Sequence, residues 1–260
     1  MFARSRLGVS RGVVLTAALL AAMIAAILPG SAAADGTDGR APDHWGVIAR
    51  NTIGSPVAEL RNGPYVSGVP AAFAKPPFGR GSLGIEVADR STTLNPPSEK
   101  VDFGNEVDFL GSRILTLRQV GFHVFQTGEN ITYGGGPTNM PNIRFEIDPN
   151  RPSLPNDNYS TLVWVPPAVP TANQWSPYLD ATTTGTWYLT GGETVCTSSS
   201  PCTFANLKTS FTSVHATPTV YSVAVGKGRD HMWIGAVDGL RLNNHIYDFE
   251  PDGVRKLRAN

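Results

Sequence analysis

The sequence predicts an all-β protein, an antiparallel β-sandwich with one short helix. Three successive segments near the C-terminus, residues 219–226, 231–242 and 245–251, alternate their side chains as strands do, and each is followed by a turn signal. The middle segment has apolar groups at both alternating positions, which indicates a central strand that is covered on both faces. Because such a strand needs a layer on either side, we expect two packed sheets.

An export signal precedes the folded part of the chain. Three arginines within the first 11 residues come before an apolar run, residues 13–28, which gives way to the small residues Ala32, Ala33 and Ala34. A transmembrane anchor is the alternative, but it needs about 20 apolar residues and this run is shorter. We therefore expect cleavage after Ala34 and a secreted, extracellular protein that is free of the membrane.

The expected organisation is a signal peptide over residues 1–34, an irregular segment over residues 35–55, a single domain over residues 56–254 and a C-terminal tail over residues 255–260. A mature chain of about 226 residues suits one large β domain. Loss of the three signal arginines would leave 18 basic residues against 21 acidic ones. This balance argues against a nucleic-acid partner. Separately, we expect the protein to be a monomer.

The middle of the chain holds further strand candidates. Around Glu146, the apolar residues Ile143, Phe145 and Ile147 alternate with polar ones, which is typical of a strand with one face in solvent. The expected strands cover residues 57–61, 83–87, 107–110, 114–118, 121–126, 143–147, 159–165 and 186–189.

Two local features stand apart from the strands. Residues 203–211 are the one helix candidate, with Thr203 as N-cap and three apolar residues at helical spacing. Just before them, Cys196 and Cys202 enclose five residues. In an exported protein this pair predicts a disulfide bond, because the compartment is oxidising.

A glycine pattern imitates a nucleotide-binding motif. Gly79, Gly81 and Gly84 match G-x-G-x-x-G, which binds pyrophosphate only where a strand precedes it and a helix follows. Here a strand follows instead. We interpret these residues as glycines at the entrance of a strand.

The C-terminal third carries a recognisable order of short elements: a helix (TFANLKTSF), then YSVAVGKGRD, IGAVDGLRLNN and YDFEP. Over residues 187–254 this order resembles the C-terminal half of exported bacterial jelly-roll domains, which are similar in outline to carbohydrate-binding modules and lectin-like sandwiches. The chain as a whole resembles a family of secreted actinobacterial proteins. The resemblance implies an antiparallel jelly roll and export, and it assigns no chemistry.

Aromatic residues favour a non-catalytic binding protein whose partner is a glycan or a cell-wall polysaccharide. Sugars pack their C–H faces on exposed rings, and Trp175 and Tyr178 lie in a loop rich in polar residues and proline, where we expect exposure. Tyr133 is a further candidate. The tryptophans on strands, Trp164, Trp187 and Trp233, are expected in the core.

Carboxylates support an alternative, a glycoside hydrolase or lyase that acts on polysaccharide. Glu146 and Asp148 resemble the start of the E-I-D-x-E strand motif of laminarinase-like jelly-roll hydrolases, but Asn150 stands where the second glutamate belongs. We therefore interpret Glu146 as a surface residue and Asp148 as a turn residue, and expect no catalytic residue. A structural protein of the cell envelope is the other alternative.

Calcium is the one cofactor that the sequence suggests. Lectin-like jelly rolls hold structural ions where terminal strands meet, and by that analogy Glu59, Asp238, Asp248 and Glu250 are the candidate ligands. The pair Asp238-Gly239 equally suits a bulge or turn.

Overall fold

The computed structural model describes residues 44–87, 99–135, 139–169, 171–191 and 195–259. The expected signal peptide and its cleavage site lie outside the described residues. Within them, no helix has both the length and the apolar character needed to span a membrane.

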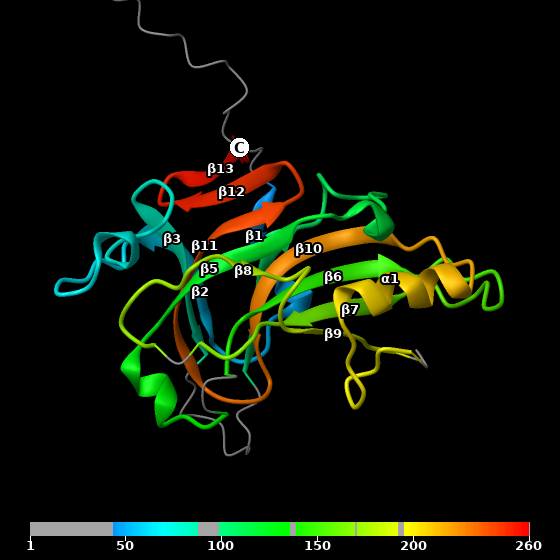
Figure 1. Ribbon diagram of the computed structural model, residues 1–260, viewed down its shortest axis with the longest axis horizontal. Coiled ribbons are helices and arrows are strands. Elements are labelled where there is room, and N and C mark those ends of the chain that lie inside the picture. The colour runs from blue at the N-terminus through cyan, green and yellow to red at the C-terminus, as the bar shows by residue number, and fades with distance from the viewer. Residues whose placement is uncertain (1–43, 88–98, 136–138, 170, 192–194, 260) are drawn as a thin grey trace, which may run out of the picture. The chain divides into compact units, whose positions relative to one another are not determined.

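Two antiparallel sheets form the protein (Figure 1). The six-stranded sheet has the order β1-β4-β10-β6-β7-β9, with bounds β1 Trp45–Val47, β4 Lys100–Asn105, β10 Thr219–Gly228, β6 Asn142–Asp148, β7 Ser160–Val165 and β9 Thr186–Leu189. The seven-stranded sheet has the order β13-β12-β11-β3-β2, with β5 beside β11 and β8 beside β5; the bounds are β13 Gly253–Arg258, β12 His245–Glu250, β11 Trp233–Leu242, β3 Gly81–Val87, β2 Val57–Asn62, β5 Val120–Gln126 and β8 Leu179–Asp180. The predicted all-β sandwich is confirmed.

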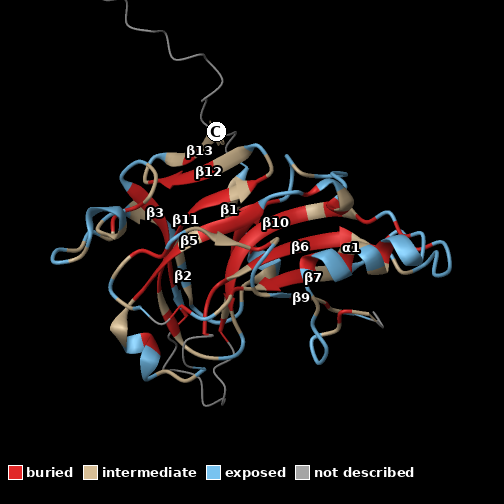
Figure 2. Cartoon of the chain, in the orientation of Figure 1, coloured by how far each residue is buried: buried red, intermediate tan, exposed pale blue. Residues whose placement is uncertain are grey.

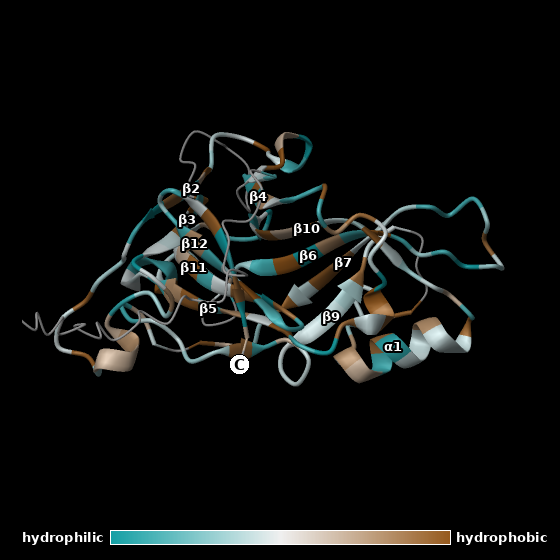
Figure 3. Cartoon of the chain, turned by 90° about the horizontal axis from the view of Figure 1, so that it is seen from above, coloured by the Kyte–Doolittle hydropathy of each residue, from teal (hydrophilic) through white to brown (hydrophobic). Residues whose placement is uncertain are grey.

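A shared hydrophobic core joins the two sheets. One cluster of buried side chains contains Leu83 and Ile85 of β3 together with Phe145 and Ile147 of β6, and the strands are buried along most of their length (Figure 2). Hydrophobic and hydrophilic residues alternate along β6 (Figure 3). Alternation therefore sends every second side chain into the core and leaves the others on the outer face of the sheet.

Strand β11 is central, as its two apolar faces predict. Its first half, from Trp233 to Val237, pairs with β3, its last residues, from Leu240 to Leu242, pair with β12, and β5 lies along its other edge. The strand tryptophans expected in the core, Trp164, Trp187 and Trp233, are fully buried.

The single α-helix of the described residues, α1 (Phe204–Ser213), begins where the sequence predicts. The Thr203 hydroxyl accepts a hydrogen bond from the Asn206 amide at 3.2 Å, and the Phe204 ring lies 5.4 Å from that of Trp187 on β9. The predicted disulfide between Cys196 and Cys202 is confirmed. Short 3₁₀ helices cover Ala49–Asn51, Ala71–Phe73, Ile114–Thr116 and Gly128–Ile131.

Two expected strands do not form: one segment is a turn, and the other begins with a 3₁₀ helix. Residues 107–110 turn because the Asn105 side-chain oxygen accepts hydrogen bonds from the amides of Val107 and Asp108, both at 2.9 Å, which ends β4. Residues 114–118 begin with a 3₁₀ helix rather than a strand. Their apolar side chains fill the core without joining a sheet, and hydrophobicity alone does not separate these outcomes.

Two short strands lie where the sequence suggested irregular chain. Strand β1 pairs with β4 inside the expected N-terminal segment, and β13 occupies most of the expected tail by pairing with β12. Basic side chains from Arg255 to Arg258 hide the strand pattern of β13, because long charged side chains can cover a sheet edge while their ends stay in solvent.

Candidate functional site

The aromatic loop does not offer the ring that the sequence favoured. Trp175 is fully buried against Phe125, and its indole nitrogen donates a hydrogen bond to the Pro64 carbonyl oxygen at 3.0 Å. The prediction that this ring is exposed is therefore wrong: a polar loop folds over the outer face of β5 and needs an apolar anchor. Tyr178 and Tyr133 are half-buried. No described contact brings these two tyrosines together, and their binding role stays a prediction.

Three of the four proposed calcium ligands do meet. Asp238, Asp248 and Glu250, which we call the acid cluster, are buried on the outer face of the seven-stranded sheet, beneath the turn that contains Gly79. The Asp238 carboxylate accepts hydrogen bonds from the amides of Phe78 and Phe249, both at 3.1 Å. Glu250 accepts from the amides of Arg80 at 2.6 Å and of Gly81 at 3.1 Å.

Two glycines of the false nucleotide motif, Gly79 and Gly81, lie at this cluster. A Cβ atom on Gly79 would lie 1.7 Å from Oε1 of Glu250, and this residue has a φ of +50°. Gly81 opens strand β3 and Gly79 precedes it, so the interpretation as a strand entrance is confirmed for these two glycines, whereas Gly84 lies inside the strand. Glycine is needed at position 79 because the backbone passes directly over a carboxylate.

Burial raises the pKa of two carboxyl groups in the acid cluster. Burial, followed by the charge of Asp248, raises the pKa of Asp238 well above its ordinary value. Burial and the neighbouring charge of Glu250 raise the pKa of Asp248 to about 6. Among the described residues, no hydrogen-bond donor reaches one buried oxygen each of Asp248 and Glu250, although Nε of Arg80 is 3.7 Å from the Glu250 oxygen.

These residues do not fit a calcium ion as they stand. Glu59 lies exposed on β2, apart from the buried cluster. In the part of the chain that the structure describes, no group of three or more His, Cys, Asp or Glu side chains is arranged to hold a metal ion. Calcium needs six to eight oxygens, and both carboxylate oxygens of Asp238 already accept hydrogen bonds from backbone amides. The structure gives the calcium prediction no support.

Glu146 is not the surface residue that the sequence suggested. It is 3% exposed, and its carboxylate accepts hydrogen bonds from Asn51 at 3.1 Å, from Tyr159 at 2.9 Å, from Ser222 at 2.7 Å and from Arg50. We call these five residues the Glu146 cluster. The prediction failed because the segment after β1 folds back across the outer face of the six-stranded sheet and covers β6.

The Glu146 cluster is built to hold a charge rather than to transfer a proton. Burial raises the pKa of Glu146, but the hydrogen bonds from Ser222, Asn51 and Tyr159 and the charge of Arg50 together hold it below its ordinary value. A glycosidase would need a second carboxyl group as acid. The nearest one along the strand, Asp148, accepts a hydrogen bond from the Asn150 amide at 2.8 Å, as a turn residue does. Its predicted turn role is therefore confirmed.

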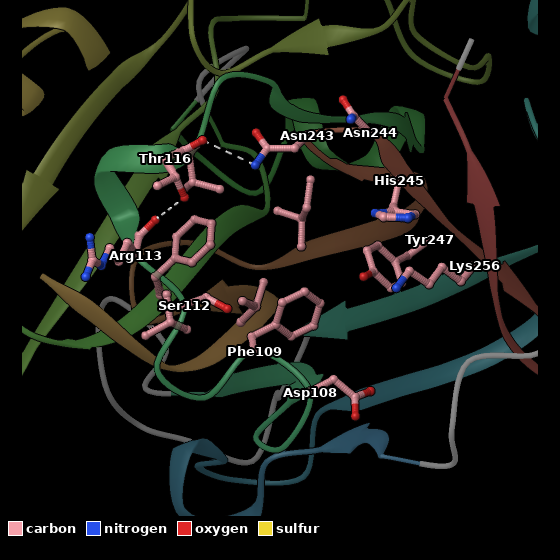
Figure 4. A pocket seen from close by; sticks show the side chains of 15 residues that line it. Asp108, Phe109, Ser112, Arg113, Thr116, Asn243, Asn244, His245, Tyr247 and Lys256 are labelled. Carbon is pink, nitrogen blue, oxygen red and sulfur yellow. Dashed lines mark hydrogen bonds between the residues drawn. The ribbon is translucent and has the colours of Figure 1, made fainter.

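A pocket of about 560 Å³ opens at one end of the sandwich (Figure 4). We call it the end pocket. Its floor is formed by buried side chains of both sheets, among them Phe145, Val223 and Leu242. The rim consists of exposed or half-buried residues, most of them polar: Asp108, Phe109, Ser112, Arg113, Thr116, Asn243, Asn244, His245 and Lys256.

One residue fixes the mouth of the end pocket. Asn243 has a φ of +56° in the turn between β11 and β12. Its side chain accepts a hydrogen bond from the Arg118 amide at 2.6 Å and donates one to the Thr116 carbonyl oxygen at 3.3 Å (Figure 4). The loop before β5 is therefore tied to the β11–β12 hairpin.

Aromatic rings line one side of this mouth. The rings of Phe109 and Tyr247 are 5.5 Å apart and edge to face, and Trp45 lies 5.1 Å behind Tyr247. Burial and the charge of Asp108 raise the pKa of Tyr247 to about 12, so its hydroxyl is a hydrogen-bond donor at neutral pH.

Sequence reasoning missed this pocket. The sequence predicts strands over residues 107–110 and 114–118, which contain Phe109 and Thr116, and a turn after residue 242. The polar residues around the turn at Asn243 were the only sequence feature that could have indicated the pocket. They do not indicate that this turn contacts the loop before β5. A second depression, of about 660 Å³ between the disulfide loop and α1, is lined by no aromatic or charged side chain of the described residues.

Comparison with protein-family models, curated proteins and solved structures finds no match for this chain.

Proposed function

We propose that the protein is a secreted, non-catalytic carbohydrate-binding protein that takes a sugar unit in the end pocket. The observation that carries this proposal is the half-buried ring of Phe109 beside Tyr247, surrounded by amide and hydroxyl groups. A flat ring suits the C–H face of a sugar, and Asn244, Ser112 and the Tyr247 hydroxyl suit its hydroxyl groups. The pocket volume of about 560 Å³ lies within the range of small-molecule sites.

The rim of the pocket suits a ligand that has polar groups as well as an apolar face. Phe145 and Val223 are each 1% exposed, so the ring of Phe109 is the main aromatic surface that a ligand would meet beside the polar groups of the rim. A purely apolar ligand would leave the amides and charges of the rim without partners, which costs free energy.

A glycan array with matched variants tests the proposal. We expect wild-type protein to bind at least one glycan, and Phe109→Ala to weaken that binding by roughly 10-fold, because one stacked ring contributes about 1 kcal/mol or more. Leu110→Ala is the control, since Leu110 is 65% exposed and does not line the pocket.

Because Phe109 also contacts Trp45, a melting curve must show that Phe109→Ala is folded. Asn244→Ala is a second variant on the exposed part of the rim. Binding that neither variant weakens would contradict the proposed site. Release of reducing ends from a bound polysaccharide would indicate a glycoside hydrolase or lyase instead.

A further inference from the structure

Strands β12 and β13 form one side of the end pocket, and this side carries basic residues. The two strands pair in antiparallel register, which places His245 opposite Arg258 and Tyr247 opposite Lys256. Alternation puts all four on the face of the sheet that carries Phe249 and Val254 into the core. Of these four, His245, Tyr247 and Lys256 line the pocket, and we call these three the basic wall.

Two donors of this wall have no acceptor. Among the described residues, neither the Lys256 ammonium nor the Tyr247 hydroxyl forms a hydrogen bond or an ion pair. The side chains of Tyr247, Lys256 and His245 lie together on one side of the pocket (Figure 4). Because both residues line the pocket and are cross-strand partners, their donors suit one negatively charged oxygen-bearing group.

Charges of both signs surround the wall. Burial and the charges of Lys256 and Arg258 lower the pKa of His245. Among the described residues that line the pocket, Asp108 is the one carboxylate, and its charge acts on Tyr247. Asp108 is itself engaged: it is 2.8 Å from Nδ1 of His44 and accepts a hydrogen bond from the Asn105 amide group at 2.7 Å.

We propose that the sugar unit bound in the end pocket is anionic, and that Lys256 and Tyr247 bind its carboxylate or other acidic group. This inference rests on the proposed carbohydrate-binding function and names the class of sugar. The ring of Phe109 would receive the face of the sugar, and the acidic group would point to the basic wall. A neutral sugar would leave the Lys256 ammonium without a counter-ion in a half-buried position.

Paired polysaccharides separate this inference from the function on which it rests. The probes are polygalacturonate with its methyl ester, and glucuronoxylan with unsubstituted xylan. We expect the acidic member of a pair to bind at least 10-fold more tightly than the neutral one, because a hydrogen bond to a charged group contributes more than a neutral one. Equal binding within each pair would overturn the inference and leave the proposed function standing. If no glycan on the array binds, both are overturned.

Variants test the two donors directly. On the acidic probe that binds, Lys256→Gln and Tyr247→Phe should each weaken binding by about 5- to 10-fold. Arg255→Gln is the matched control: it lies on the same strand but on the other face, and its guanidinium is 3.4 Å from Asp252. Binding by Lys256→Gln that equals binding by the control would overturn the inference. Added salt should weaken wild-type binding more than binding by Lys256→Gln.

Discussion

Glu146 and Asp248 are acidic residues on strands, and both are buried, at 3% and 2% exposed. Both point away from the shared core, because their neighbours Phe145 and Phe249 point into it. Their surroundings differ. Hydrogen-bond donors reach Glu146 from four residues, whereas Asp248 faces the charge of Glu250 and keeps one oxygen without a partner. The pKa of Glu146 is lowered and that of Asp248 is raised.

The difference lies in what the chain folds over each strand. The segment after β1 supplies the Glu146 cluster with a guanidinium and an amide side chain. The turn over the acid cluster supplies backbone amides and Arg80, whose side chain is 66% exposed and 3.7 Å from Glu250. Burial alone therefore does not decide the charge of a carboxyl group; the donors that are buried with it do.

The largest expected effect is at Glu146. Glu146→Ala leaves the Ser222 hydroxyl and the Asn51 amide without their acceptor and Arg50 without its buried partner. We expect the free energy of unfolding to fall by about 3 kcal/mol, measured by urea denaturation at pH 7.

Glu106→Ala is the control for this change. Glu106 pairs with the same Arg50, but both side chains are about half exposed. The expected loss is below about 0.5 kcal/mol, because surface ion pairs contribute little. Equal losses in the two variants would mean that the donors around Glu146 do not stabilise the fold.

A smaller loss is expected at the turn above the acid cluster. Gly79→Ala places a methyl group on the Glu250 carboxylate and strains a φ of +50°. Glu250 must then move away from the amides of Arg80 and Gly81, and we expect a loss of about 2 kcal/mol in the free energy of unfolding.

Gly68→Ala separates the two causes of that loss. Gly68 has a φ of +78° and nothing within 4 Å of an added Cβ atom, so its variant reports backbone strain alone. We expect Gly68→Ala to cost about 1 kcal/mol. A Gly79→Ala variant that is no less stable than Gly68→Ala would show that the contact with Glu250 is unimportant.

The two carboxylate clusters also differ from the rest of the fold in how well the sequence predicts them. Strands with clean alternation, such as β6 and β11, the N-cap at Thr203 and the disulfide were predictable, because each depends on residues close together in the chain. The two carboxylate clusters were not. Whether Glu146 is covered depends on residues about 95 positions away, and its own strand gives the pattern of a solvent-exposed face.

The sequence did not predict the end pocket, for a related reason. Its mouth joins Asn243 to residues near Thr116, 127 positions away, through hydrogen bonds of a side chain. The apolar residues of this loop pack into the core from a 3₁₀ helix, so a pattern that is judged by hydrophobicity alone predicts a strand. For Trp175 the error was the opposite one: the polar loop predicted an exposed ring, but the ring is buried and anchors the loop.

The smallest effect that we predict is a gain in stability with a pH signature. The pKa of Asp248 is about 6 in the folded protein, against an ordinary value of 3.8. The folded state therefore holds this proton more tightly than the unfolded chain does. The free energy of unfolding contributed by this group is highest in acid, falls as pH rises from about 4 to about 6, and is constant above. Glu146 has the opposite sign: its stabilisation is present above its unfolded pKa and is lost in acid.

Asp248→Asn tests this sign. The variant removes the charge that faces Glu250, and its amide can donate a hydrogen bond to the Glu250 carboxylate. We expect it to be about 1 kcal/mol more stable than wild type at pH 8, with the difference developing between pH 4 and pH 6 in urea denaturation. A variant that is less stable than wild type at pH 8 would mean that Asp248 is stabilised as an anion, as Glu146 is, and the contrast between the two clusters would be lost.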